Sequence, residues 1–188
     1  MYGIYNAGPL FNKAERQQRK IEGANLMHNF GSKFKIFNPV EFDFNSGDVV
    51  PTNKEIFDYD YNCMTKSKYF LFDIDGRDDG TFVELGIAIQ MALNDSDKFI
   101  IGIFSDFRIG KANQGEWPGY GINEFVTGPF YNEKLVNNKK MSQIYMVESH
   151  DKAIELIHEI EKVQNKNFDE TEIEILNNKF HDFKKNSW

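Results

Sequence analysis

The sequence has little of what builds covalent or metal-held scaffolds. Cys63 is the only cysteine among 188 residues, which excludes an internal disulfide. The four histidines are scattered without HxH or HxxxH spacing, so no metal site is predicted from them. No apolar run is long enough to span a bilayer, and the first residues do not resemble a secretion signal. We therefore expect a cytoplasmic protein that binds neither a membrane nor a metal.

Arginine is also scarce, and acidic residues are in excess. Only four arginines occur, at positions 16, 19, 77 and 108, and the formal net charge is -7. A surface for a nucleic acid polymer normally carries clustered positive charge. The composition therefore argues against DNA or RNA as a partner.

Apolar runs of strand length alternate with helix-favouring segments along the chain. Strands are predicted near residues 3–6, 33–37, 69–72, 99–104 and 143–147, and helices near 12–29, 52–65, 81–93, 122–126, 151–163 and 171–183. Such alternation is typical of a parallel sheet covered on both faces. The predicted fold class is α/β, a flavodoxin-like or Rossmann-like five-stranded parallel sheet flanked by helices. Residues 1–188 are expected to form one domain, with 150–188 as a helical C-terminal extension.

The segment after the third strand is rich in aspartate and has several local interpretations. Asp73-Ile74-Asp75-Gly76 resembles the opening motif of haloacid-dehalogenase-type phosphatases, with Asp73 as nucleophile and Asp75 as acid. Against this interpretation, Arg77 stands where that family expects a threonine or similar residue. The motif also lies far from the start of the chain, where that family places it.

Two further interpretations concern Glu84. Asp73, Asp75 and Glu84 occupy the first, third and twelfth places of an EF-hand-like loop, but the sixth place, which needs glycine, is Asp78. Thr81 and Glu84 also have the spacing of a capping box, in which Glu84 would only satisfy free N–H groups of its own helix. Spacing alone favours this last interpretation.

Four blocks spread along the chain form a wider pattern. They are Ile4–Phe11, Asp60, Asp78–Gly86 and Gly119–Asn123. In order and spacing they resemble the nucleoside 2-deoxyribosyltransferase family, over residues 1 to about 147. The resemblance implies that Glu84, before Leu-Gly, is the nucleophile.

The same resemblance implies roles for other residues. Asp78 and Asp60 would hold and protonate the nucleobase, with Asp58 as the rival of Asp60, and Tyr5 would orient the nucleophile. Asn123 would be lent to the sugar site of a neighbouring subunit, so a homo-oligomer is expected.

The loop after the first strand supplies further candidates, because ligands in this architecture bind beyond the carboxyl ends of the strands. Asn6, Gly8 and Phe11 are therefore candidate substrate-binding residues, and the ring of Phe11 could stack on a base.

The chemistry agrees with these residue types. Exchange of the base on a 2-deoxyribose passes through an oxocarbenium-like state, and a carboxylate that captures the sugar divides one difficult displacement into two easier ones. A second carboxyl must protonate the departing base. At a helix start, Glu84 is expected to have a lowered pKa and to stay ionised. The expected substrates are deoxyribonucleosides and free purine or pyrimidine bases, with no cofactor.

Two rival functions keep a similar fold. A 2-deoxynucleoside 5'-monophosphate glycosidase must also hold a phosphate dianion, which calls for serines, an arginine or several free N–H groups. The stretch from Asn6 to Pro9 offers no serine, and no arginine is evident nearby in sequence. A non-catalytic nucleotide-sensing module would lack the acid or the nucleophile, whereas Asp78 and Glu84 are both present.

Overall fold

The five predicted strands form one parallel sheet. The structure is a computed structural model that describes residues 2–42, 50–76, 78–106, 122–136, 140–165 and 169–181. Its strands are β1 (Gly3–Ala7), β2 (Lys35–Phe37), β3 (Ser67–Asp73), β4 (Phe99–Ile103) and β5 (Ile144–Val147). They pair in the order β2-β1-β3-β4-β5, and every pairing is parallel. The predicted fold class is confirmed.

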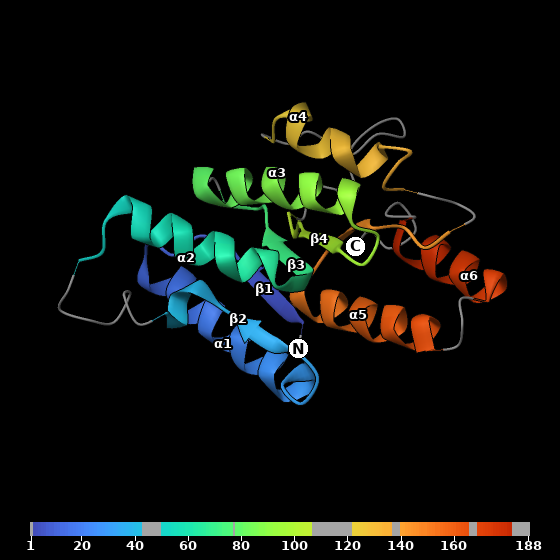
Figure 1. The fold of residues 1–188 in the computed structure, drawn as a ribbon, viewed down its shortest axis with the longest axis horizontal. Helices are drawn as coiled ribbons and strands as arrows, with labels where there is room; N and C mark the ends of the chain where they lie inside the picture. The colour runs from blue at the N-terminus through green and yellow to red at the C-terminus, as the bar shows by residue number, and fades with distance from the viewer. Residues whose placement is uncertain are drawn as a thin grey trace.

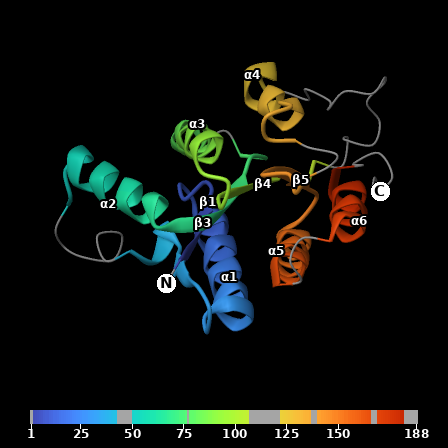
Figure 2. The same cartoon turned by 45° about the vertical axis from the view of Figure 1, so that its right-hand side comes forward.

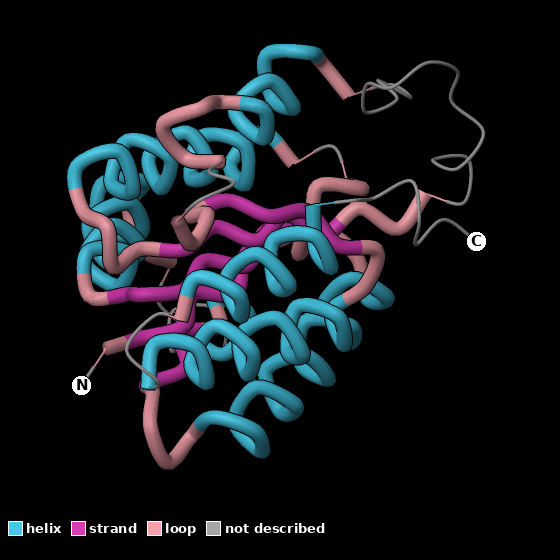
Figure 3. The backbone as a smooth tube through the Cα atoms, turned by 90° about the vertical axis from the view of Figure 1, so that its right-hand side faces the viewer, coloured by secondary structure: helices cyan, strands magenta, loops and turns pink. Residues whose placement is uncertain are grey.

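Helices cover both faces of this sheet (Figures 1, 2 and 3). One face carries α2 (Asn53–Thr65) and α3 (Asp79–Asn94), with the short α4 (Glu124–Thr127) beyond α3. The other face carries α1 (Lys13–Phe30), α5 (His150–Asn165) and α6 (Glu170–His181). Short 3-10 helices span Pro39–Glu41 and Gly128–Tyr131. Among the described helices, none is long and apolar enough to cross a membrane.

The sheet separates two apolar cores. Successive side chains of a strand point to opposite faces, so Ile4 packs with α1 and α5 while Tyr5 packs with α2 and α3. All five residues of β1 are buried, as expected for a central strand of a parallel sheet. This alternation decides which residues of β1 can reach each group of helices.

The C-terminal helices pack against the sheet. Ile173, Leu176 and Phe180 of α6 belong to the core on the α1 and α5 side. The side chain of Asn177 accepts a hydrogen bond from the hydroxyl of Tyr145 on β5 at 3.0 Å. The α6 helix therefore covers the end of the sheet formed by β5.

Helices α1 and α2 begin with capping boxes, whereas α3 does not begin at the predicted one. Asn12 and Thr52 each form a capping box with the glutamate three residues later, which fixes the starts of α1 and α2. The predicted capping box of Thr81 and Glu84 is wrong. Asp78 is the N-cap of α3 and accepts a hydrogen bond from the amide of Gly80, so the helix begins before Thr81 and Glu84 lies inside it.

Candidate active site

The central contact of the site joins the first strand to the third helix. The hydroxyl of Tyr5 donates a hydrogen bond to Oε1 of Glu84, with 2.6 Å between the oxygens, across 79 positions of sequence. Tyr5 is fully buried, and Glu84 lies in the second turn of α3. One oxygen of the Glu84 carboxylate is therefore held by a group that supplies no positive charge.

A pocket of about 430 Å³ lies between α2 and α3, and Glu84 lines it. The lining residues are Asn53, Ile56, Phe57, Asp60, Tyr61 and Met64 from α2, and Asp79, Gly80, Val83, Glu84 and Ile87 from α3. None of these described lining residues is lysine, arginine or histidine. The pocket thus combines an apolar wall with three carboxylates.

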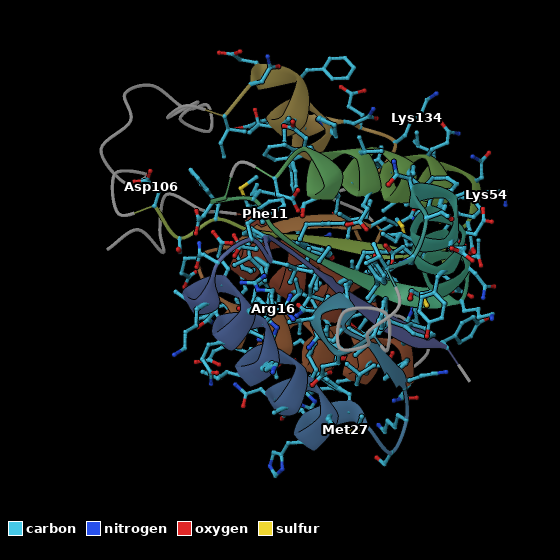
Figure 4. The ribbon with its side chains drawn as sticks, turned by 90° about the vertical axis from the view of Figure 1, so that its left-hand side faces the viewer. Phe11, Arg16, Met27, Lys54, Asp106 and Lys134 are labelled. Carbon is cyan, nitrogen blue, oxygen red and sulfur yellow. The ribbon has the colours of Figure 1, made fainter. Side chains whose placement is uncertain are left out.

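The α2 helix presents Asp60 rather than Asp58 to this pocket. Asp60 is partly buried, and its Oδ1 has no hydrogen-bond partner among the described residues. Asp58 is exposed and pairs with Lys54, which Figure 4 shows at the outer edge of the molecule. Of the two alternatives left open by the sequence, Asp60 is the one that meets Glu84 in the pocket.

Burial controls the ionisation of both carboxyl groups. It raises the pKa of Glu84 to about 7; the hydrogen bond from Tyr5 opposes this shift, and the charges of Asp60 and Asp78 add to it. Burial also raises the pKa of Asp60 to about 6. The expected lowering of the Glu84 pKa at a helix start is wrong, because the side chain is buried beside other carboxylates and no described residue of the pocket lining supplies a compensating cation.

The carboxylate of Asp78 is engaged within its own turn. Its oxygens accept hydrogen bonds from the amide of Gly80 at 3.0 Å and from the hydroxyl of Thr81 at 2.6 Å. Asp78 does not line the pocket, although its charge acts on Glu84. Its observed contribution is to set the start of the helix that carries Glu84.

Asn6 in the first strand, and Gly8 and Phe11 after it, do not line the pocket. Asn6 is buried and points to the α1 face, where its amide donates to Glu22 and Asn38 at 3.3 Å each. Gly8 packs against Arg19 of α1. Phe11 is 79% exposed beside the start of α1 (Figure 4).

Asn123 also lies away from the pocket lining. It is the N-cap of α4, and its side-chain oxygen accepts a hydrogen bond from the amide of Phe125 at 2.8 Å. The rest of the block from Gly119 to Gly121, together with Arg77, lies outside the described residues.

The aspartates of the phosphatase and calcium interpretations have other partners. Asp73 forms an ion pair with Arg19 at 2.6 Å, and Asp75 accepts a hydrogen bond from the amide of Ser105 at 2.8 Å. Glu84 bonds to Tyr5. Among the described residues, no group of three or more His, Cys, Asp or Glu side chains is placed to hold a metal ion.

Sequence reasoning missed the aromatic wall of the pocket. The rings of Phe57 and Tyr61 stack with centroids 5.7 Å apart and planes 16° from parallel. They remain 55% and 42% exposed, although both line the pocket. Their spacing of four residues on α2 was a usable signal, because residues i and i+4 share a helical face with Ile56 and Asp60 nearby.

Comparison with known proteins identifies the family. The sequence model of the nucleoside 2-deoxyribosyltransferase family matches residues 4–157. The chain belongs to the nucleoside 2-deoxyribosyltransferase family. Tyr5, Asp60, Asp78 and Glu84 all fall within the matched region of this family member.

This deoxyribosyltransferase family member is similar to one further protein in sequence and to another in structure. An uncharacterized protein of Ureaplasma parvum serovar 3 is 30% identical over 133 residues, which cover 66% of this chain and 80% of the relative. The crystal structure of a conserved protein from Enterococcus faecalis V583 superposes with a TM-score of 0.57 at 18% identity. That match covers 82% of this chain and 96% of the other, and it supports the fold.

Proposed function

We propose that this protein transfers the 2-deoxyribosyl group between nucleobases through a covalent glutamyl intermediate on Glu84. The observation that carries the proposal is the pairing of Glu84 and Asp60 in one pocket, with Tyr5 holding an oxygen of Glu84. Two partly buried carboxyl groups with pKa values near neutrality can divide the roles of nucleophile and acid. Family membership supplies the class of substrate.

The reaction begins from the form with an ionised Glu84 and a protonated Asp60. The pKa values of about 7 for Glu84 and about 6 for Asp60 make this the less populated of the two singly protonated forms. The carboxylate of Glu84 attacks C1' of the sugar while the glycosidic C–N bond breaks and its electron pair moves to the base. Asp60 donates its proton to a ring nitrogen of the departing base. The products of this half-reaction are a glutamyl ester of deoxyribose, a neutral free base and an ionised Asp60.

The second half-reaction reverses these roles with another base. A ring nitrogen of the incoming base attacks C1', the ester bond to Glu84 breaks, and Asp60 accepts the proton that this nitrogen loses. The enzyme returns to its starting protonation state. Neither half-reaction consumes a cofactor.

The charge of the pocket favours neutral nucleosides over their 5'-monophosphates. Its described lining contains Asp60, Asp79 and Glu84 and no cationic side chain. A phosphate dianion would be repelled by these carboxylates and would find no charged partner among them. We therefore expect deoxyadenylate to be a poor substrate.

We also propose a homo-oligomer in which Asn123 approaches a neighbouring subunit. Two observations support it: Asn123 lies outside the pocket of its own chain, and Phe125 beside it is 90% exposed. Light scattering during size-exclusion chromatography should give the wild type a mass of at least two chains. The Phe125→Glu variant should have a lower mass. A monomeric wild type would contradict the proposal.

The activity is tested by mixing the protein with deoxyinosine or thymidine and free adenine in the presence of a chelator. We expect deoxyadenosine to form, and chromatography measures it. Deoxyadenylate tested in parallel should release little adenine. Absence of both transfer and slow hydrolysis with every nucleoside donor would contradict the proposal, and efficient cleavage of deoxyadenylate would favour the glycosidase instead.

A further inference from the structure

A second buried polar cluster lies across the sheet from the pocket, at the carboxyl ends of β1 and β3. Its centre is Arg19 of α1, which is 3% exposed. Nη2 of Arg19 donates to Oε1 of Glu22 at 2.9 Å and to Oδ2 of Asp73 at 2.6 Å. Nη1 donates to the carbonyl of Ala7 at 3.5 Å. One side chain thus joins α1 to the last residues of two strands.

The loops that follow these strands interlock around this cluster. A Cβ atom at Gly8 would lie 2.2 Å from Nη1 of Arg19, so only glycine leaves room for the guanidinium. A Cβ atom at Gly76 would lie 2.7 Å from Cγ of Pro9, so the loop after β3 rests directly on the loop after β1. A shift of either loop would disturb the other.

The contacts continue from Asp73 toward α3. Oδ1 of Asp73 accepts a hydrogen bond from the amide of Asp75 at 3.1 Å, and the Asp75 carboxylate accepts one from the amide of Ser105 at 2.8 Å. Asp78 then caps α3. Framework contacts therefore occupy the aspartates of the Asp73-Ile74-Asp75-Gly76 motif.

We propose that Arg19 is a positioning residue for the nucleophile: by tying the end of β1 to the end of β3, it fixes Glu84 relative to Tyr5. Tyr5 lies two residues before Ala7, and the segment that leads to Glu84 starts at Asp73. Both sides of the 2.6 Å contact between Tyr5 and Glu84 are thereby anchored to one guanidinium. This inference rests on the proposed function, because it assigns Arg19 a part in the same reaction.

Arg19→Lys is the sharpest substitution, because it keeps the charge that the buried carboxylates need but loses the planar fork that bridges them. We expect kcat per folded enzyme to fall by about 10- to 100-fold with little change in KM. KM is spared because the aromatic wall of the pocket lies on α2, across the sheet. A residue that only stabilised the fold would leave kcat unchanged when measured well below the melting temperature.

Gly8→Ala provides a second route to the same disturbance, because its Cβ displaces the guanidinium. Gly8→Ala alone should lower kcat, but in the Arg19→Lys background it should add little. Gly128→Ala is the matched control, since a Cβ there meets nothing within 4 Å. Full additivity of Gly8→Ala and Arg19→Lys would mean that Gly8 acts independently of the guanidinium and would overturn the proposal, as would an unchanged kcat in Arg19→Lys.

Hydrogen exchange separates this proposal from the proposed function. The amides of Gly80 and Phe82 donate to Asp78 at the start of α3, at 3.0 and 3.2 Å. In Arg19→Lys both should exchange faster than in the wild type, whereas in Gly128→Ala they should not. If the wild type catalyses no transfer, the proposed function fails, and these amides still decide whether Arg19 holds α3. Unchanged exchange in Arg19→Lys would overturn the positioning role.

Discussion

Two groups of buried or partly buried carboxylates lie on opposite faces of the same sheet, and they differ in what neutralises their charge. On the α1 face, Glu22 and Asp73 share the guanidinium of Arg19. On the α2 and α3 face, Glu84 and Asp60 share a pocket whose described lining contains no cation. Neighbouring residues of β1 donate hydrogen bonds to the two groups: Asn6 donates to Glu22, and Tyr5 donates to Glu84.

The presence or absence of a cation suits the two groups of carboxylates to different roles, one structural and one chemical. Burial raises the pKa of Glu22, but Arg19 and hydrogen bonds from Gln18 and Asn6 oppose that rise. Burial raises the pKa of Glu84 to about 7, and among the described residues only the hydrogen bond from Tyr5 opposes it. A carboxyl group that exchanges its proton near neutral pH suits catalysis, whereas a paired one suits a fixed framework.

The largest effect is expected at Glu84. Glu84→Gln keeps the size of the side chain and an oxygen for the Tyr5 hydroxyl, but an amide cannot capture the sugar. Transfer should fall by on the order of 10³-fold or more, measured as initial rates of deoxyadenosine formation. Asp58→Asn, at an exposed carboxylate of α2, should retain the wild-type rate. Substantial transfer by the Glu84→Gln variant would contradict the assignment of Glu84 as the nucleophile.

The next effect concerns the acid. The active pocket carries one proton shared between groups with pKa values of about 6 and about 7, so kcat/KM of the wild type should peak between these values. Asp60→Asn should lower kcat by about 10²-fold, because the base must leave without a proton from this carboxyl. In this variant the decline of kcat/KM on the alkaline side should disappear. A pH profile with its alkaline limb intact would assign the proton to another group.

Tyr5→Phe should have a smaller effect with a distinct signature. The Tyr5 hydroxyl lowers the pKa of Glu84, so its removal raises that pKa and leaves less of the nucleophile ionised. We expect kcat/KM to fall by about tenfold at pH 6 and the profile to move to higher pH. An equal loss at every pH would mean that Tyr5 acts without changing the ionisation of Glu84.

The smallest effect is on stability. Because the folded pKa of Glu84 is raised above its unfolded value, protonated Glu84 contributes stability at low pH, and this is lost as pH rises through about 7. The Glu84→Gln variant does not lose this stability as pH rises, because the glutamine side chain does not ionise. The variant should therefore be more stable than the wild type at pH 8 by about 1–3 kcal/mol, and the difference should shrink toward pH 5. Denaturant unfolding at both pH values measures it, and a difference independent of pH would contradict the raised pKa.

Local rules predicted much of the fold but only part of the site. Strand-length apolar runs predicted the sheet, and the helix-favouring segment 52–65 predicted α2, because these signals depend on near neighbours. The capping box of Thr81 and Glu84 failed because Asp78 offers an equally local cap three residues earlier. The orientation of the Asn6 side chain could have been predicted, because successive side chains of a strand point to opposite faces of the sheet and Asn6 follows Tyr5.

The remaining features depend on residues far apart in sequence. Arg19 and Asp73 are separated by 54 positions, and neither spacing nor composition pairs them. The aromatic wall of Phe57 and Tyr61 becomes a pocket only where α3 lies beside α2. The raised pKa of Glu84 likewise depends on burial that the order of residues does not reveal.

The most direct test is to look for the covalent intermediate. The wild type is mixed with deoxyinosine in the absence of an acceptor base, quenched in acid within the first turnover and digested for mass spectrometry. We predict an added mass of one deoxyribosyl group on the peptide that contains Glu84, and its disappearance when adenine is supplied before the quench. Rapid release of hypoxanthine with no adduct, or an adduct on the peptide that contains Asp60, would contradict the assignment of Glu84 as the nucleophile.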